Sequence, residues 1–444
     1  MKRPRLLLWS VTAIVIVCGA VAAYVVVGPG PMGFSGRTHV GLNEYSGPNP
    51  TGAPDELKSA ALIAQGEYLA RAADCMVCHT AKGGIPFAGG RPFVLPFGTI
   101  YSTNITPDTE TGIGRYTDQD FLNAVQRGIS RDGTRLYPAM PFASYTWMSD
   151  RDVLAIKAYV FSLTPVHAPA QANTLGFPFN QRYLMALWSA FFNPDKRFEP
   201  ATDRSAAWNR GAYLVEALGH CGECHTPRNL GMALDNRRKF AGAVQAGWRA
   251  YNITPDRSAG IGEWSDAELA HYLSMGHTAG RGTASGPMGE AIDESLSHLT
   301  AGDISAMVTY LRTVPAHTSP DLPALRTQPA SPSFADDRSR NLLGKAVYAG
   351  ACVGCHGWSG ISPSLSTATL TGTRAINDPK AMNVAQVIIG GGQRHAADSS
   401  IYMPDFGSYS DDEIASVANY VTERFGAQGS KLTARDIEKM RAAD

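Results

Sequence analysis

The chain has 444 residues, of which 44% are apolar and 18% charged, and its 39 Lys and Arg residues balance 39 Asp and Glu residues. A chain of this length has room for roughly two to four domains. It contains neither a basic stripe nor an alternation of basic and aromatic residues, which excludes nucleic acid as a partner.

The first element expected along the chain is a transmembrane anchor at residues 1–28. Three basic residues precede the uncharged stretch 6–27, which as a helix would span roughly 33 Å, enough for a bilayer core of about 30 Å. The basic flank predicts that the rest of the chain lies on the periplasmic side. The small residues at 20–22 leave a cleaved signal peptide as the alternative, but the long apolar run favours a retained anchor.

Two further segments are predicted to lack regular structure. Residues 29–54 are dense in Gly and Pro, which indicates a tether, and His39 within it is interpreted as a loop residue. Residues 317–340 form a Pro-rich spacer.

The chain repeats one motif, Cys-x-x-Cys-His, three times. Two thiols about one helical turn apart can each add to a vinyl group of one haem, and the adjacent histidine then faces the iron. A single Cys-x-x-Cys could equally be a redox dithiol or half of a zinc site. The threefold repetition, with Cys18 as the one cysteine outside the motifs, favours three covalently bound haem c groups. The motif residues are Cys75, Cys78 and His79; Cys221, Cys224 and His225; and Cys352, Cys355 and His356.

The motif spacing predicts three tandem haem domains, which we call units 1, 2 and 3. The predicted order is the anchor at 1–28, the tether at 29–54, unit 1 at 55–166, an apolar linker helix at 167–201, unit 2 at 202–316, the Pro-rich linker at 317–340, unit 3 at 341–426 and a tail at 427–444.

Units 1 and 2 repeat more than the motif. The sequence Asn-Ile-Thr-Pro-Asp occurs at 104–108 and again at 252–256, followed both times by Gly-Ile-Gly, and unit 3 lacks it. We expect these two loops to pack around the haem edge or its propionates. Ser and Thr residues at helix starts predict caps, and apolar residues at helical spacing follow them. The expected caps are Thr117 with Asp120, Ser149 with Asp152 and Ser410 with Glu413, and the expected core stripes are Val153, Ile156 and Val160 in unit 1 and Ile414, Val417 and Val421 in unit 3.

The linker segment 177–194 is apolar and rich in aromatic residues. A core helix between units 1 and 2 is the favoured interpretation, because apolar segments are usually buried. Contact with lipid or with a partner subunit is the alternative.

The sixth iron ligand decides the chemistry of a c-type haem, since a closed site can only pass electrons whereas an open site can bind oxygen species. Each unit has a methionine beside a proline in a loop ahead of its last helix: Met140, Met288 and Met403. Proline keeps the neighbouring backbone extended, so that the thioether can reach toward iron. We therefore predict His/Met ligation at all three haems, and we find no candidate catalytic residues.

The segments YSTNITPD at 101–108 and YPAMPF at 137–142, together with the order of the three motifs, make the chain resemble the cytochrome c subunit of membrane-bound bacterial dehydrogenases. That family serves alcohol, aldehyde, gluconate, sorbitol and fructose dehydrogenases. The resemblance covers residues 57–425 and matches all twelve predicted ligand positions.

The resemblance implies an all-α fold of three tandem cytochrome c domains after the anchor, and a non-catalytic role. Electrons would pass from a catalytic subunit of molybdenum, PQQ or flavin type, accompanied by a small or iron–sulfur subunit, to ubiquinone at the periplasmic side of the inner membrane. The anchor and tether depart from the family and lean toward an aldehyde dehydrogenase partner. Two alternatives stay open: a peroxidase-like haem enzyme with one open haem, and the cytochrome c subunit of a terminal oxidase.

Overall fold

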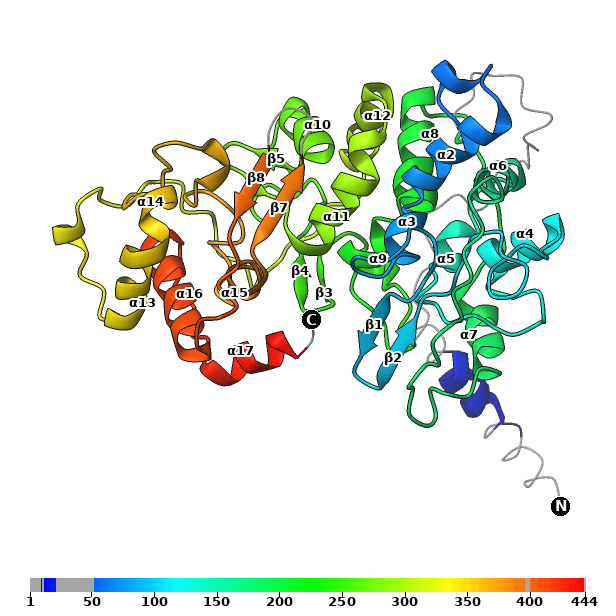
Figure 1. The fold of residues 1–444 in the computed structure, drawn as a ribbon, viewed down its shortest axis with the longest axis horizontal. Coiled ribbons are helices and arrows are strands. Elements are labelled where there is room, and N and C mark those ends of the chain that lie inside the picture. The colour runs from blue at the N-terminus through cyan, green and yellow to red at the C-terminus, as the bar shows by residue number, and fades with distance from the viewer. Residues whose placement is uncertain (1–8, 10–11, 21–51, 396–399, 443–444) are drawn as a thin grey trace.

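The computed structural model describes residues 9, 12–20, 52–395 and 400–442 (Figure 1). No helix within these ranges is both long enough and apolar enough to cross a membrane. The predicted transmembrane anchor is therefore corrected; its described part over 12–20 is helical. The rest of the anchor, and the predicted tether up to residue 51 with His39, lie outside the described residues.

Unit 1 begins and ends with helices that cross each other. The elements from unit 1 to the linker are η1 (Asp55–Leu57), α2 (Leu62–Ala72), α3 (Cys75–Cys78), β1 (Pro92–Leu95), β2 (Gly98–Tyr101), α4 (Asp118–Arg127), α5 (Phe142–Tyr145), α6 (Asp150–Val160) and the linker helix α7 (Leu184–Phe192).

Unit 2 repeats this order and adds a second hairpin and three short helical turns, η2, η3 and η4. Its elements are α8 (Ala206–Tyr213), η2 (Leu214–Leu218), α9 (Gly222–His225), η3 (Asn236–Arg238), β3 (Ala243–Gln245), β4 (Trp248–Ala250), α10 (Asp266–Met275), β5 (His277–Thr278), β6 (Gly282–Thr283), α11 (Gly286–Glu294), η4 (Leu296–His298) and α12 (Ala301–Leu311).

Unit 3 lies at the opposite end of the molecule from unit 1 (Figure 1). The elements of unit 3 and its flanks are η5 (Phe334–Asp336), α13 (Leu342–Val347), η6 (Tyr348–Cys352), α14 (Val353–His356), η7 (Ser366–Ala368), α15 (Met382–Gly390), β7 (Gly392–His395), β8 (Ser400–Met403), α16 (Asp411–Phe425) and α17 (Ala434–Arg441). The fold is thus helical, but four two-stranded antiparallel sheets, β1–β2, β3–β4, β5–β6 and β7–β8, depart from the expected all-α class.

A glycine in the first helix of each unit allows close contact with the last helix. A Cβ atom on Gly66 would lie 1.9 Å from the carbonyl oxygen of Ala155, and one on Gly211 would lie 1.9 Å from that of Ala306. In unit 3 a Cβ on Gly344 would meet a backbone oxygen at 2.3 Å. Since no side chain fits there, α2 crosses α6, α8 crosses α12 and α13 crosses α16 with their backbones in contact.

The predicted helix starts and core stripes are confirmed. Thr117 and Ser410 each form a capping box, and Ser149 accepts a hydrogen bond from the backbone N–H of Asp152. The stripe residues of α6 and α16 are buried. These features depend on residues three or four apart, which is why the sequence reveals them.

Units 1 and 2 share one hydrophobic core, whereas unit 3 has its own. Leu69 and Val153 of unit 1 belong to the same buried cluster as Leu214 and Ile304 of unit 2. The core of unit 3 is built around α15 and α16 and is separate. The predicted domain boundaries stay a prediction, but units 1 and 2 pack as one body because their apolar helices bury each other.

Unit 3 instead meets unit 2 through polar contacts. The guanidinium of Arg249 lies 3.3 Å from the carboxylate of Asp378, which is fully buried, and 2.6 Å from that of Asp321. Asn383 accepts from the backbone N–H of Arg249 at 2.8 Å and donates to its carbonyl at 2.9 Å. Buried polar groups need partners, so these contacts fix the place of unit 3 on β4.

Candidate functional site

The three Cys-x-x-Cys-His motifs lie on short helical turns, α3, α9 and α14, soon after the first helix of each unit. In units 2 and 3 a π-helical turn, η2 or η6, precedes the motif. All seven cysteines belong to the described part of the chain, and none is bonded to another. Each motif therefore offers two free thiols and an adjacent imidazole.

The surroundings of the thiols do not favour the redox or zinc alternatives. Burial raises the pKa of Cys75, Cys78 and Cys221 to about 12 and that of Cys224 and Cys352 to about 11. Redox dithiols depend instead on a thiol of lowered pKa. Within the described ranges no three His, Cys, Asp or Glu side chains converge as metal ligands, so a zinc site would lack its remaining ligands.

Each motif histidine is held in the same way. Nδ1 of His79 lies 2.7 Å from the carbonyl oxygen of Thr103, and Nδ1 of His225 lies 2.6 Å from that of Tyr251. In unit 3, His356 makes the same contact with the carbonyl of residue 368 at 2.6 Å. A carbonyl can only accept, so Nδ1 must carry the proton, and Nε2 keeps its lone pair for a metal.

Burial also keeps these imidazoles neutral. It lowers the pKa of His79, His225 and His356, and the carbonyl contact only partly opposes this. Neutral imidazole is the form that binds iron. Two thiols, a protonated Nδ1 and an available Nε2 are the donor set that covalently bound haem needs, so the residues fit that group at all three motifs.

The repeated Asn-Ile-Thr-Pro-Asp loops hold the carbonyls in place. Asn104, which follows Thr103, is 2% exposed, and its amide nitrogen donates to the carbonyl of Val166 at 2.7 Å and to the hydroxyl of Thr111 at 3.2 Å. Its carbonyl oxygen accepts from the backbone N–H of Thr106 at 2.9 Å. Both amide hydrogens are thus used by protein atoms, so the loop orients the histidine and Asn104 has no hydrogen left for a propionate.

Asn252 repeats this network in unit 2, donating to the carbonyl of His317 at 2.5 Å and accepting from the backbone N–H of Thr254 at 2.8 Å. In unit 3, which lacks the loop, the short helix η7 supplies the carbonyl instead. The same histidine contact therefore arises from two different local structures.

The three predicted methionine ligands lie in different local structures. Met140 precedes α5, Met288 lies in the first turn of α11, and Met403 ends β8. The expected loop position is thus wrong for Met288, because Pro287 is accommodated in the first turn of α11, and for Met403, which is the last residue of a strand. All three side chains are partly buried against the hydrophobic cores. Their ligation of iron stays a prediction.

Helix α11 lies between the other two sites. It contacts α3, which carries the first motif, and also β7, whose hairpin partner ends at Met403. Arg91 joins unit 1 to α11 by an ion pair with Glu290 at 2.7 Å and donates to the carbonyl of Val77 within the first motif at 3.0 Å. The site of unit 2 is therefore central among the three (Figure 1).

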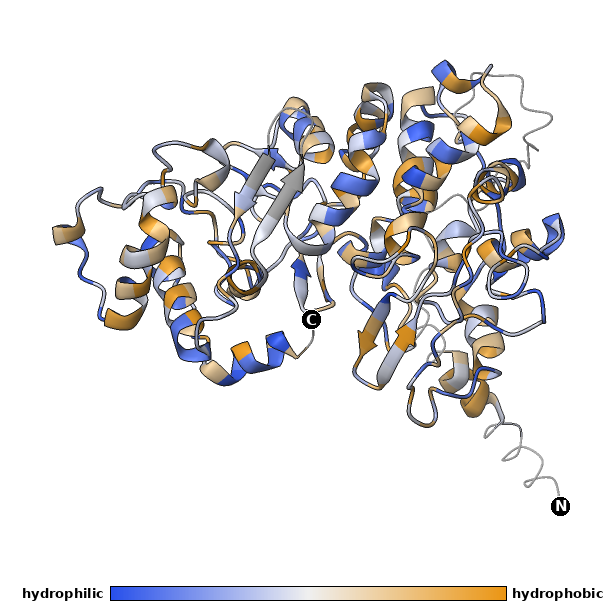
Figure 2. Cartoon of the chain, viewed as in Figure 1, coloured by the Kyte–Doolittle hydropathy of each residue, from blue (hydrophilic) through white to orange (hydrophobic). Residues whose placement is uncertain are grey.

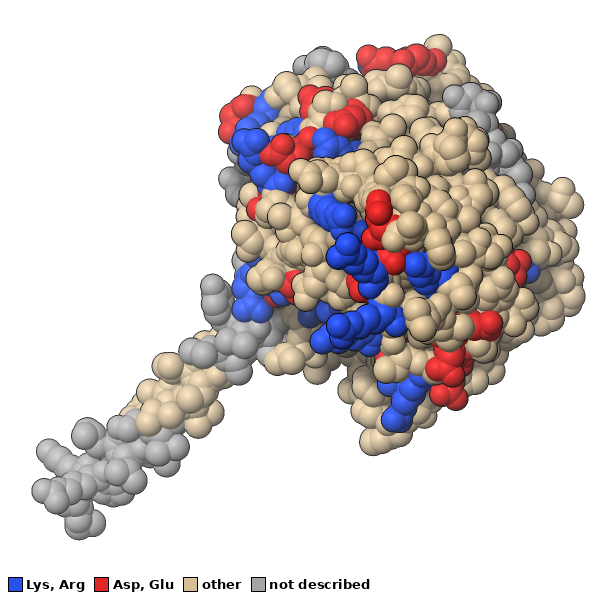
Figure 3. Space-filling model, turned by 90° about the vertical axis from the view of Figure 1, so that its left-hand side faces the viewer, with Lys and Arg blue, Asp and Glu red and all other residues tan. Residues whose placement is uncertain are grey.

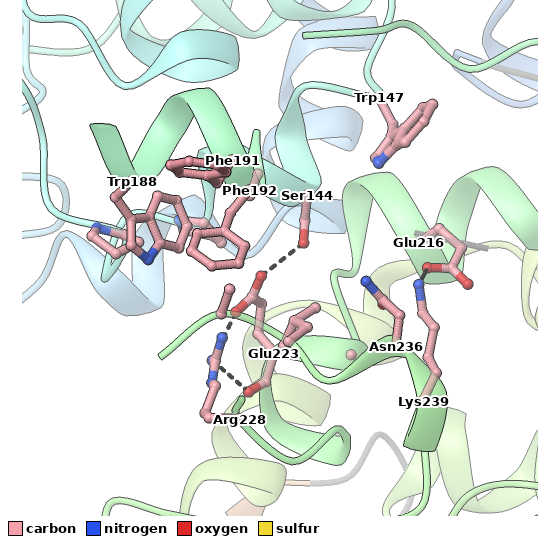
Figure 4. A pocket seen from close by; sticks show the side chains of 16 residues that line it. Ser144, Trp147, Trp188, Phe191, Phe192, Glu216, Glu223, Arg228, Asn236 and Lys239 are labelled. Atoms are coloured by element: carbon pink, nitrogen blue, oxygen red, sulfur yellow. Dashed lines mark hydrogen bonds and ion pairs between the residues drawn. The ribbon is translucent and has the colours of Figure 1, made fainter. Parts of the chain in front are cut away.

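A cleft lies where the methionine loop of unit 1 meets the second motif and α7 (Figure 4). Glu223, inside the second motif, accepts from the hydroxyl of Ser144 and from Arg228, each at 2.8 Å. Glu216 and Lys239 form a buried ion pair beside it. Aromatic side chains of α7 form the other wall of the cleft. Paired charges and aromatic packing thus join unit 1 to unit 2 next to the second motif.

Sequence reasoning did not mark Asp74 or His220 as special positions. The two residues precede the first cysteine of motifs 1 and 2, with left-handed φ angles of 55° and 35°. Among the described residues, Asp74 Oδ1 and His220 Nε2 are buried without a hydrogen-bond partner. Burial raises the pKa of Asp74 to about 8 and lowers that of His220. The ring of Tyr145 in unit 1 packs on His220 of unit 2 at 5.3 Å, a contact between units that no sequence pattern marks.

The chain is similar to known proteins over most of its length. The family model for cytochrome c matches residues 63–164 and 342–424. The chain is 38% identical over 411 residues to the gluconate 2-dehydrogenase cytochrome c subunit of Pantoea cypripedii, covering 87% of this chain and 91% of that protein. It is 40% identical over 407 residues to the fructose dehydrogenase cytochrome subunit of Gluconobacter japonicus, covering 86% and 82%.

A third relative is longer than this chain. It is a nicotinate dehydrogenase subunit of Pseudomonas putida, 41% identical over 377 residues, which cover 83% of this chain and 31% of that protein. The chain thus spans about a third of the length of that relative.

Proposed function

Because this chain belongs to the cytochrome c subunits of dehydrogenase complexes, we propose that it holds three covalently bound haem c groups and passes electrons from a dehydrogenase subunit to ubiquinone. Membership of this family makes it an electron-transfer subunit and not the catalytic one. Haem supplies the one-electron carrier, while the chain supplies ligands, orientation and surroundings.

One repeated observation carries the proposal. In each of the three units the motif histidine has its Nδ1 on a backbone carbonyl at 2.6 or 2.7 Å, which leaves Nε2 for iron. A histidine that merely packed in a core would not need the same tautomer three times. This repetition supports three haems, although the family model matches only two segments.

The contacts of α11 support a relay in which the haem of unit 2 stands between the others. Helix α11 carries Met288 and touches elements of both other sites. An electron crossing the chain between units 1 and 3 would therefore pass through unit 2.

The catalytic partner is proposed from the names of the related proteins and from the chemistry of haem electron transfer. The relatives are named for gluconate, fructose, alcohol and nicotinate dehydrogenases. We assign a catalytic partner of molybdenum, PQQ or flavin type, a small or iron–sulfur subunit, and a place at the periplasmic side of the inner membrane. The preference for an aldehyde dehydrogenase loses much of its basis, because it relied partly on the anchor that the structure does not support.

Haem counting and co-purification test the proposal. The haem-to-protein ratio of the full chain should be three, and replacing Cys75 and Cys78 by Ser should lower it to two. The complex should contain a dehydrogenase whose substrate reduces the haems, and a ubiquinone analogue should reoxidise them. A ratio of two in the unmodified chain, or haems that the partner's substrate leaves oxidised, would overturn the proposal.

A further inference from the structure

The linker helix α7 is apolar on both of its faces. Trp188 packs inward, its ring 5.6 Å from that of Phe142. On the outer face Tyr183, Leu187 and Phe191 recur every fourth residue and are 70%, 60% and 55% exposed. A surface helix of a soluble domain normally has polar residues on its outer face. The expectation of a core helix is therefore only half met, since the outer stripe of α7 has no cover among the described residues.

Two neighbouring segments extend this stripe. Phe177 and Leu230 are 81% and 83% exposed. The indole N–H of Trp188 donates to the carbonyl of Gly231 at 2.8 Å, which ties the loop of Leu230 to α7. Phe179 stacks on Phe97 with ring centres 3.9 Å apart and holds the preceding loop. Phe177, Tyr183, Leu187, Phe191 and Leu230 together form what we call the α7 patch.

The segments that carry the α7 patch hold no acidic residue, and the acidic residues that follow them are paired, Asp195 with Arg127 at 3.0 Å and Asp235 with Arg237 at 2.9 Å. Residues 171–194 and 228–234 contain no Asp or Glu. Arg182 is exposed beside the patch, with its guanidinium over the ring of Tyr137 at 5.0 Å. By contrast, the far end of the molecule shows basic and acidic side chains mixed together (Figure 3).

We propose that the α7 patch docks on the surface of a phospholipid bilayer, with Arg182 at the level of the anionic headgroups. Leucine and aromatic side chains beside arginine, without carboxylates, are the composition of helices that lie in the membrane interface. A protein partner would be expected to pair with a polar rim of hydrogen-bonding groups, whereas the exposed side chains of the α7 patch are apolar apart from the hydroxyl of Tyr183, and the ribbon of α7 is mostly apolar (Figure 2). The apolar helix at 12–20 lies at the same lower end of the molecule (Figure 1).

The inference rests on the membrane location proposed above and names the surface that makes the contact. It does not require any segment to cross the bilayer. Docking of α7 would place the aromatic side of the cleft next to the lipid phase.

Labelling from the lipid phase tests the proposal on the full haem-loaded chain. The protein is mixed with vesicles of phosphatidylcholine and phosphatidylglycerol that carry a photoactivatable lipid, and labelled peptides are mapped by mass spectrometry. Peptides containing 177–191 and 228–234 should be labelled at least fivefold more than those around Leu342 and Leu365, which are 75% and 55% exposed in unit 3. Vesicles without phosphatidylglycerol should give weaker labelling, as should Arg182→Gln.

A pair of variants provides the matched control. Leu187→Ser with Phe191→Ser should lower the labelling of the 228–234 peptide at least threefold, because that loop docks together with α7. The double variant Leu342→Ser with Leu365→Ser should leave the labelling of the 228–234 peptide unchanged. Equal labelling of both ends, or no effect of the α7 variants, would overturn the proposal. Loss of labelling on addition of the dehydrogenase partner would assign the patch to a protein contact and also overturn it.

Reduction of the haems by the partner's substrate in detergent separates this inference from the proposed function. If lipid labelling fails while the haems are still reduced, the docking surface is wrong and the relay stands. If the haems are not reduced, the relay itself fails.

Discussion

The hydroxyl of Tyr68 donates a 2.5 Å hydrogen bond to the carboxylate of Asp303, a residue 235 positions later in the chain. The contact is reciprocal, since Tyr213 of unit 2 donates to Asp152 of unit 1 at 2.6 Å. Each tyrosine hydroxyl oxygen also accepts a hydrogen bond, at 3.1 Å, from the backbone N–H of the residue that caps the helix carrying its aspartate partner. The first helix of each unit thus holds the start of the last helix of the other, as in a two-fold interface.

Removing the hydroxyl of Tyr68 and removing that of Tyr213 should lower the free energy of unfolding by different amounts. Asp303 keeps a bidentate ion pair with Arg210 at 2.7 and 2.6 Å, whereas no ion pair to Asp152 is found in the described part of the chain. We expect Tyr68→Phe to lower the free energy of unfolding by about 1 kcal/mol and Tyr213→Phe by about 2 kcal/mol. Urea unfolding followed by circular dichroism measures both. The control Tyr137→Phe, at an exposed contact, should stay within about 0.5 kcal/mol, and equal losses at Tyr68 and Tyr213 would contradict the prediction.

The close crossing of α8 and α12 should not tolerate a side chain. A Cβ on Gly211 would lie 1.9 Å from the carbonyl oxygen of Ala306, so Gly211→Ala should lower stability by about 3 kcal/mol through forced separation of the helices. Gly302, in α12 itself, is the control, because its nearest neighbour would lie 3.8 Å from an added Cβ. Gly302→Ala should be neutral or stabilise by up to about 1 kcal/mol. A melting temperature unchanged in Gly211→Ala would show that the crossing is looser than described.

Loss of the loop that orients His79 should affect one haem alone. Asn104→Ala removes the bonds that fix the neighbouring carbonyl, so the histidine loses part of its hydrogen bond and becomes a less basic ligand. We expect the reduction potential of the haem in unit 1 to rise, and stability to fall by about 2 kcal/mol. Spectroelectrochemical titration resolves the haems, and the exposed Asn180→Ala should leave all potentials unchanged. A uniform shift of every haem would argue against a local effect.

The methionine ligands can be tested singly. Replacing Met140, Met288 or Met403 by Ala should each remove about one third of the red-region sulfur-to-iron band of the oxidised protein and lower one reduction potential. Carbon monoxide should then bind one reduced haem per chain, while the unmodified protein should bind little. Met232, which is exposed, provides the control. Carbon monoxide binding by the unmodified chain would instead favour an open haem.

The buried carboxyl of Asp152 should give a distinct pH dependence. Burial raises its pKa above the ordinary value of 3.8, so the folded protein holds this proton more tightly than the unfolded chain does. Its contribution to stability therefore falls as the pH rises from that ordinary value through the raised one. Asp152→Asn should gain stability relative to the unmodified protein in urea unfolding as the pH rises above about 4.

An exposed aspartate provides the control of opposite sign. Hydrogen bonds from Thr134 lower the pKa of Asp132 from its ordinary value of 3.8, so its contribution to stability is lost only as the pH falls below that value, and above about pH 4 Asp132→Asn should show no gain that grows with pH. If the stability difference between Asp152→Asn and the unmodified protein did not change with pH, the hydrogen bond from Tyr213 would offset the cost of burying the Asp152 carboxylate.

Much of the local structure could be predicted from the sequence. The caps at Thr117, Ser149 and Ser410 and the buried stripes that follow them depend on residues within one or two helical turns. The expected anchor is wrong: it was inferred from hydropathy alone, and no helix among the described residues is long and apolar enough to cross a membrane. For the site, the sequence predicted the residue types and their spacing along the chain, but not their contacts.

By itself the sequence determined the three Cys-x-x-Cys-His motifs, the repeated units and the family, because covalent attachment and helix periodicity are written in short spacings. Only the tertiary structure decided which carbonyl orients each histidine, that units 1 and 2 share a core, and that α11 lies between the sites. Those contacts join residues far apart in the chain, often through backbone atoms that every residue type carries. They therefore depend on the path of the folded chain and leave no periodic trace in its sequence.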